Sequence, residues 1–186
     1  MYNDECGMKN TKKVLLIGGG TGGHILPLRN LADALLNKGA QVELVVADAA
    51  LDRRMAAKDF ADIPVHYFRT GKIRRYFSFQ NFVDIFVIFG SFFRAKKLLR
   101  QIKPDVVFFK GGFVGFPFLV ALKLLGGFKG LIYSHESDIS PGALTRMVSK
   151  YADAVFSNFG DRPMPLFYQP PSLPQDQEIS LNSKNL

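Results

Sequence analysis

The 186-residue sequence predicts an α/β domain, with a parallel sheet and helices on both of its faces. Short segments rich in Val, Ile, Leu and aromatic residues alternate with segments of helical periodicity along most of the chain. The strand-like segments are apolar at nearly every position, as in strands that are buried on both faces. A glycine-rich stretch joins the first strand-like segment to the first helix-like one. Together these observations favour a Rossmann-like fold.

Each element has its own pattern. Six strands are expected, over residues 13–18, 41–46, 64–68, 104–109, 130–135 and 153–158. Five helices are expected, over residues 25–38, 51–58, 79–103, 114–125 and 142–151. Ser140 and Pro141 resemble an N-cap and a proline in the first helical position of the last helix. Right-handed crossovers between parallel strands then predict the strand order 3-2-1-4-5-6.

The length and composition fit one domain, over residues 13–158. Residues 1–12 form a polar leader without the apolar core of a signal peptide, and we expect it to be disordered. Residues 159–186 form a proline-rich segment without periodicity, which we expect to be poorly ordered. The single cysteine, Cys6, excludes a disulfide framework and indicates a reducing, cytoplasmic setting. No zinc-type ligand spacing occurs, so no metal is expected.

The net charge of +8 arises entirely within residues 69–103, which hold nine Lys or Arg, one acid and seven of the 18 Phe residues. Basic residues interleaved with Phe indicate a lipid surface rather than nucleic acid. The apolar run at 85–93 is too short to span a bilayer, so we expect docking on an anionic membrane. The alternative is that the Phe side chains are ordinary core. The expected docking residues are Arg74, Arg75, Phe77, Phe82, Phe86, Arg94, Lys96 and Lys97.

The glycine-rich stretch suits an anion at a helix N-terminus, where backbone N–H groups face the ligand. Gly18, Gly20 and Gly23 match the dinucleotide-binding fingerprint, and Asp48 follows the second strand as a ribose-binding acid would. An NAD(P)-binding dehydrogenase domain is therefore one alternative. His24 argues against it, because dinucleotide loops keep small residues there, although His24 could simply bond to nearby backbone.

Two further stretches follow the fourth and fifth strands. The first contains Gly111 and Gly112, and the second contains His135, Glu136 and Asp138. Each has an ordinary structural explanation when it is taken alone. The carboxyl ends of parallel strands share one rim, however, so we expect these residues and the glycine loop to surround a single crevice.

These residues resemble the MurG family of bacterial peptidoglycan glycosyltransferases. The family motif Gly-Gly-Thr-Gly-Gly-His-x-x-Pro is matched from Gly19 to Pro27. A Lys-Pro-Asp-Val-Val strand is matched at 103–107, and a Gly-Gly-Phe-Val turn at 111–114. The motif His-Glu-x-Asn/Asp-x-x-Pro-Gly is matched at 135–142. These matches occur in order and in register over residues 13–158.

The resemblance implies the N-terminal, acceptor-binding half of a GT-B enzyme. Such an enzyme transfers N-acetylglucosamine from its UDP sugar to undecaprenyl-diphospho-muramoyl-pentapeptide (lipid I), forming lipid II at the cytoplasmic face of the plasma membrane. His24 or Asp138 would act as the base on the acceptor hydroxyl. No cofactor is implied. The residues expected to bind the acceptor and its diphosphate are Gly19, Gly20, Thr21, Gly22, Gly23, Gly111, Gly112, His135 and Glu136.

The chain departs from the family pattern after Asn158, where no second sheet follows. Since the family binds its UDP sugar mainly in a C-terminal domain, the donor would be bound only through a domain missing here. The chain is then either a shortened reading frame or a genuine half-enzyme with a separate donor subunit. A non-catalytic subunit that docks on the membrane, as in the split eukaryotic glycosyltransferases, is the remaining alternative.

Overall fold

The computed structural model describes residues 11–70, 79–123, 128–138 and 140–157. Its six strands form one parallel sheet in the order β3-β2-β1-β4-β5-β6, which confirms the predicted fold class and strand order. The expected C-terminal segment, and all of the leader except residues 11 and 12, lie outside the described residues. The strands are β1 (Lys13–Ile17), β2 (Gln41–Ala47), β3 (Val65–Phe68), β4 (Val106–Phe109), β5 (Leu131–Glu136) and β6 (Ala154–Ser157). The helices are α1 (Gly22–Asn37), α2 (Ala50–Asp59), α3 (Phe79–Ile102), α4 (Gly115–Lys123) and α5 (Ala143–Val148).

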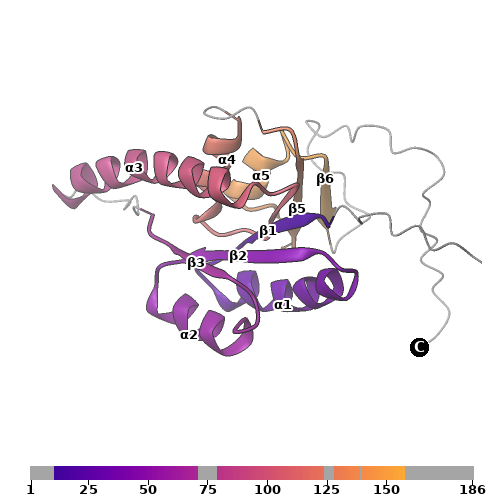
Figure 1. The fold of residues 1–186 in the computed structure, drawn as a ribbon. Helices are drawn as coiled ribbons and strands as arrows, with labels where there is room; N and C mark the ends of the chain where they lie inside the picture. The colour runs from indigo at the N-terminus through magenta and orange to yellow at the C-terminus, as the bar shows by residue number, and fades with distance from the viewer. Residues whose placement is uncertain (1–10, 71–78, 124–127, 139, 158–186) are drawn as a thin grey trace, which may run out of the picture.

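The helices form two layers around the sheet, with α1 and α2 on one face and α3, α4 and α5 on the other (Figure 1). The central strand β1 supplies both layers because successive side chains point to opposite faces. Val14 and Leu16 pack in the apolar cluster that includes α1 and α2. Leu15 and Ile17 pack in the cluster that includes α3 and α4. Burial of β1 on both faces explains its continuous apolar sequence.

Two helix starts differ from the prediction. Helix α1 begins at Gly22 rather than at residue 25, so two glycines belong to its first turn. Helix α5 begins at Ala143, with Gly142 as its N-cap, so the predicted cap at Ser140 is wrong. The reason is a side-chain contact within the same loop. The Glu136 carboxylate accepts a hydrogen bond from the Gly142 backbone N–H at 2.9 Å, and Gly142 has an extended backbone.

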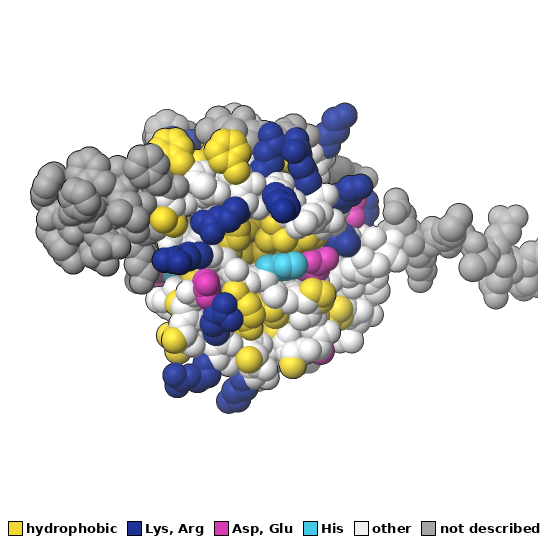
Figure 2. Space-filling view, turned by 60° about the vertical axis from the view of Figure 1, so that its left-hand side comes forward, with side chains coloured by type: hydrophobic (Ala, Val, Ile, Leu, Met, Phe, Trp, Pro, Cys, Tyr) yellow, Lys and Arg dark blue, Asp and Glu magenta, His cyan; other side chains and the backbone are white. Residues whose placement is uncertain are grey.

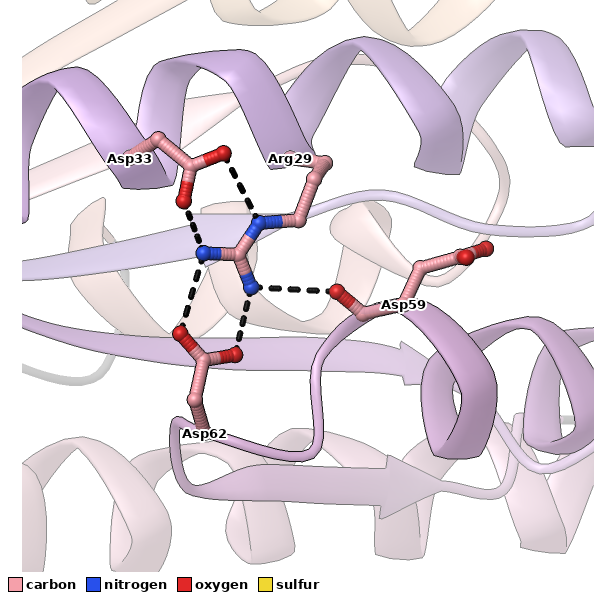
Figure 3. Close-up of polar contacts among 4 residues, drawn as sticks. All are labelled: Arg29, Asp33, Asp59 and Asp62. Carbon is pink, nitrogen blue, oxygen red and sulfur yellow. Dashed lines mark hydrogen bonds and ion pairs between the residues drawn. The ribbon is translucent and has the colours of Figure 1, made fainter.

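Arg29 ties helix α1 to the loop that follows α2 (Figure 3). Its guanidinium donates to both carboxylate oxygens of Asp33, and also to both of Asp62. A fifth hydrogen bond reaches the backbone carbonyl of Asp59 at 3.0 Å. These bonds hold the pKa of Arg29 above its usual range and lower the pKa values of Asp33 and Asp62. The clamp fixes the layer on which the glycine loop rests.

The strand order reverses between β1 and β4, which are adjacent in the sheet. The Lys13 N–H at the start of β1 donates to the Asp105 carboxylate at 2.8 Å, and the Lys110 N–H beyond β4 donates to the Ile17 carbonyl at 2.9 Å. Both ends of this strand pair are therefore tied together. The carboxyl ends of strands beside such a reversal form the usual ligand crevice of an open α/β sheet.

Candidate functional site

Three loops follow the carboxyl ends of neighbouring strands: residues 18–21 after β1, 110–114 after β4, and 137–142 after β5, of which residue 139 lies outside the described residues. The first two loops touch. A Cβ atom on Gly112 would lie 2.0 Å from the Gly19 carbonyl oxygen, and one on Gly111 would lie 3.1 Å from His24 Nε2. Both glycines also adopt positive φ angles, of +83° and +113° respectively. The structure thus brings together the glycine loop, His24 and the Gly111–Gly112 turn, as the sequence predicts.

The N-terminus of α1 faces this junction without a side-chain cap. Thr21 is the N-cap residue, but its hydroxyl makes no capping hydrogen bond, and no acid occupies the first turn of α1. A helix leaves its first N–H groups without intrahelical acceptors, and these groups carry partial positive charge. Gly22 and Gly23 supply such groups without a side chain in the way. The first turn of α1 therefore suits an anionic ligand.

The geometry of His24 favours one tautomer. Its Nδ1 lies 3.1 Å from the Gly19 carbonyl oxygen and 3.2 Å from the Thr21 hydroxyl. Because a carbonyl can only accept, Nδ1 carries the proton in the neutral ring, and Nε2 keeps its lone pair. The simple expectation of a bond to nearby backbone is thus confirmed, and this bond leaves Nε2 able to accept a proton.

Asp52 enters the glycine loop from the first turn of α2, and the sequence did not reveal it. Its carboxylate is 1% exposed and accepts the Gly20 N–H at 2.8 Å. Its other oxygen, Oδ1, is buried without a hydrogen-bond partner among the described residues. The Gly20 N–H is therefore committed to the protein itself. In sequence, Asp52 lies in a polar helix where an acid is ordinarily exposed, so only the tertiary contact identifies it.

Glu136 organises the loop after β5. Its Oε1 accepts the N–H groups of Ser137 and Asp138 at 2.9 and 3.1 Å, and its Oε2 accepts that of Gly142. Burial raises the pKa of Glu136, but these bonds, together with one from the Thr145 side chain, hold it below its usual range. The carboxylate therefore serves its own loop, and the Asp138 side chain is left exposed at the rim.

His135 and the buried Lys110 line a pocket of about 380 Å³ on the α1 side of the sheet. The other lining residues are Pro27, Leu28, Leu31, Phe108 and Phe156. Strand register explains the placement, because Phe109 pairs with Ser134 and the following residues, Lys110 and His135, point to the same face. Within the described residues, no group of three or more His, Cys, Asp or Glu side chains could hold a metal ion.

An aromatic cluster connects α3 to the start of α4 beside the Gly111–Gly112 turn. The rings of Phe89, Phe92, Phe116 and Phe113 follow one another with centroids 5.8, 5.8 and 5.9 Å apart. Phe89, Phe113 and also Phe93 are 59%, 48% and 64% exposed, whereas Ser91, Ala95 and Leu99 form the buried face of α3. Residues 89 and 93 are thus surface rather than core, contrary to the alternative expectation for this helix.

Several expected docking residues can be located only in part. Arg74, Arg75 and Phe77 lie outside the described residues, and so do the side chains of Phe82 and Phe86. Arg94 and Lys97 are exposed, and Lys96 is half-buried. Figure 2 shows Lys and Arg side chains spread over this side of the molecule with apolar side chains between them. Among the described residues, no helix combines the length and apolarity needed to cross a bilayer.

Two details separate this loop from a dinucleotide site. The third glycine of the fingerprint normally permits close packing of helix on strand, but a Cβ on Gly23 would meet only the Thr21 hydroxyl, at 3.9 Å. Asp48, the expected ribose acid, is paired with Arg53 at 2.6 Å. The contact of an uncapped helix N-terminus with a histidine and a glycine turn agrees instead with the glycosyltransferase domain that the family resemblance implies.

The chain belongs to glycosyltransferase family 28, whose N-terminal domain model matches residues 14–157. This membership rules out the dehydrogenase interpretation. Two curated relatives carry the name UDP-N-acetylglucosamine--N-acetylmuramyl-(pentapeptide) pyrophosphoryl-undecaprenol N-acetylglucosamine transferase. The one from Clostridium botulinum strain Langeland is 36% identical over 150 residues, covering 80% of this chain and 40% of the relative. The one from Streptococcus thermophilus strain LMD-9 is 34% identical over 152 residues, covering 82% and 42%.

Solved structures agree with this assignment. The crystal structure of MurG from Acinetobacter baumannii is similar with a TM-score of 0.67 and 27% identity, over 83% of this chain and 44% of that one. A putative UDP-N-acetylglucosamine 2-epimerase from Listeria monocytogenes has a TM-score of 0.51 at 16% identity, over 79% and 39%, and shares the fold alone. The chain spans about two fifths of the length of the curated relatives that it matches.

Proposed function

We propose that this chain is the acceptor-binding part of an enzyme that transfers N-acetylglucosamine from UDP-N-acetylglucosamine to lipid I in peptidoglycan synthesis. The contact between the uncapped N-terminus of α1, His24 and the Gly111–Gly112 turn is the observation that carries this proposal. The diphosphate of the acceptor would lie on the first-turn N–H groups, and the reacting sugar hydroxyl beside His24 Nε2. The UDP sugar would be bound mainly by the remaining part of the enzyme, as the family resemblance implies.

The two candidate bases have different surroundings. His24 has one nitrogen fixed by the Gly19 carbonyl, which orients the other toward the junction of the loops. Asp138 has an exposed side chain, and its loop is held by Glu136. We therefore favour His24 as the base. Asp138 would then orient the acceptor sugar.

Binding of a short-chain lipid I analogue to the purified chain tests the acceptor assignment. We expect binding to the unmodified chain and its loss in Gly23→Leu, because a side chain there would meet only the Thr21 hydroxyl, at 3.9 Å, and would obstruct the first-turn N–H groups. Ala34→Leu adds a similar volume on an exposed part of the same helix and should bind normally. A purified polypeptide of these 186 residues should bind UDP-N-acetylglucosamine only weakly, because it spans about two fifths of the length of its curated relatives. Micromolar binding of the UDP sugar, or no binding of the analogue, would refute the assignment.

We propose in addition that the enzyme docks peripherally on the cytoplasmic face of the plasma membrane. Phe89, Phe93 and Phe113 offer exposed apolar surface beside the basic residues of α3. Each basic residue near anionic lipid contributes about 1 kcal/mol, so several of them are sufficient for reversible docking.

Sedimentation with anionic vesicles tests the docking surface. We expect binding at low salt that weakens strongly as salt screens the charges. Phe89→Ser combined with Phe93→Ser should reduce vesicle binding about tenfold or more. Leu51→Ser combined with Tyr151→Ser removes exposed apolar side chains elsewhere and serves as the control. Equal binding by the two double variants would rule out this surface.

A further inference from the structure

Lys110 is a buried cation at the strand reversal. The residue follows β4, and its side chain is 4% exposed. Its backbone is fixed by the bond to Ile17, and its Nζ donates to the Ser137 hydroxyl at 2.5 Å. Among the ion pairs of the described residues, none involves Lys110. An ammonium group removed from water needs a compensating charge or several acceptors, and here it has a single hydroxyl.

The carboxylates near Lys110 do not neutralise it at close range. Glu136 is occupied by the three backbone N–H groups of its own loop, and Asp138 is exposed. Burial lowers the pKa of Lys110, while the charges of Glu136 and Asp138 act in the opposite direction. The protonated form of Lys110 is thus only partly supported by the protein.

The pocket beside Lys110 gives a ligand access to it. Lys110 and His135 are the polar residues of its lining, and no acid belongs to that lining. Pro27 and Leu28 of α1 form another part of the wall, which begins one turn beyond His24. An anion held at the first turn of α1 would therefore approach the same end of the crevice as Lys110.

We propose that Lys110 binds a phosphate group of the acceptor, as a cationic contact in addition to the N–H groups of the glycine loop. This inference rests on the proposed function, because it deepens the assignment of the diphosphate site. Lys110 becomes a residue that determines affinity for diphosphates. The Ser137 hydroxyl is then its resting partner, and the phosphate is its partner in the complex.

Calorimetry on the full 186-residue chain tests the proposal with three probes: inorganic pyrophosphate, farnesyl diphosphate and farnesol. Pyrophosphate and farnesyl diphosphate both carry a diphosphate. Comparing their affinities shows whether the site binds a free diphosphate or needs one linked to a lipid. We expect Lys110→Met to weaken binding of both diphosphates about tenfold to a hundredfold, as for loss of a charged hydrogen bond. Any binding of farnesol should be unchanged. Thermal unfolding of the variant should remain cooperative, because methionine fills the buried space of the lysine stem.

Two control variants separate this role from others. Lys129→Met removes the same charge from an exposed position before β5 and should leave diphosphate binding within about twofold. Ser137→Ala removes the resting partner but keeps the ammonium, so diphosphate binding should be retained or strengthened. If Ser137→Ala loses as much affinity as Lys110→Met, Lys110 acts by orienting the loop and the proposal is overturned. It is overturned too if Lys110→Met and Lys129→Met bind alike, or if farnesol loses affinity equally.

Diphosphate binding by the unmodified chain distinguishes failure of the Lys110 assignment from failure of the proposed function. If the original chain binds diphosphates and Lys110→Met binds them equally well, the Lys110 assignment fails and the proposed function stands. If the original chain binds neither diphosphate, the diphosphate site itself is wrong, and both fall together.

Discussion

The loop after β1 and the loop after β5 lie on the same rim but are built in opposite ways. The loop after β5 surrounds a carboxylate, because Glu136 accepts three of its backbone N–H groups. The loop after β1 gives only its Gly20 N–H to a carboxylate, that of Asp52, and leaves the first turn of α1 uncapped. The backbone N–H groups of one loop are bound by a carboxylate of that loop, and the first turn of α1 beside the other loop has no side-chain cap. The comparison teaches that one polar motif at the rim can hold its own loop together while, in our proposal, its neighbour binds the ligand.

The largest expected effect shows whether the catalytic base lies beside the loop after β1 or in the loop after β5. In a full-length enzyme containing this domain, His24→Ala should lower turnover by about 10²–10⁴-fold, because general base catalysis would be lost. Asp138→Ala should have a smaller effect, mainly on the KM for the acceptor. Steady-state kinetics with a lipid I analogue measures both. If Asp138→Ala abolishes turnover while His24→Ala retains it, the base belongs to the loop after β5.

A second prediction concerns stability and the Glu136 carboxylate. Glu136→Gln should lower the free energy of unfolding by about 2–3 kcal/mol at neutral pH, because an amide cannot accept all of these N–H groups. Since the pKa of Glu136 is lowered on folding, its contribution is present above the ordinary glutamate pKa of about 4.3 and is lost as pH falls through the folded value. Denaturant unfolding at several pH values provides the measurement.

The matched control for this prediction is Asp138→Asn, which removes an exposed carboxylate from the same loop. It should change the free energy of unfolding by less than about 0.5 kcal/mol. The difference between the original chain and Glu136→Gln should narrow below about pH 4. A difference that stays constant down to pH 3 would contradict the role given to this carboxylate.

The smallest expected effect concerns Asp52, the acid of α2 that accepts a hydrogen bond from the glycine loop. Asp52→Asn keeps an acceptor for the Gly20 N–H but removes a negative charge beside the proposed phosphate site. Pyrophosphate affinity should therefore rise about threefold to tenfold, most clearly at low salt. Asp59→Asn, at the other end of α2, is the control and should change affinity by less than twofold. A fall in affinity for Asp52→Asn would mean that this charge orders the loop for binding.

Much of this architecture could be predicted because it depends on local pattern. Apolar segments define the strands, and the fixed handedness of crossovers gives their order. The rim residues were found because their motifs directly follow strands. What escaped prediction depends on contacts between distant segments. Asp52, the Lys110–Ser137 bond and the Arg29 clamp all join residues at least 27 positions apart along the chain, apart from the local pair of Arg29 with Asp33. The start of α5 was misplaced for a different reason, because a side-chain contact within one loop, from Glu136 to the Gly142 N–H, replaces the expected cap at Ser140.

The central position of β1 has a consequence for how the chain folds. β1 pairs with β2 after a single crossover through α1. Its other neighbour, β4, follows only after the long helix α3, and the Lys13–Asp105 contact at the start of this strand pair joins residues 92 positions apart. Closing a longer loop costs more entropy, so we expect β1, β2 and β3 to associate first. Until β4 arrives, β1, with four apolar residues that are buried in the folded domain, would be a sheet edge open to pairing with another chain. During synthesis, aggregation should therefore be most pronounced while α3 is being made.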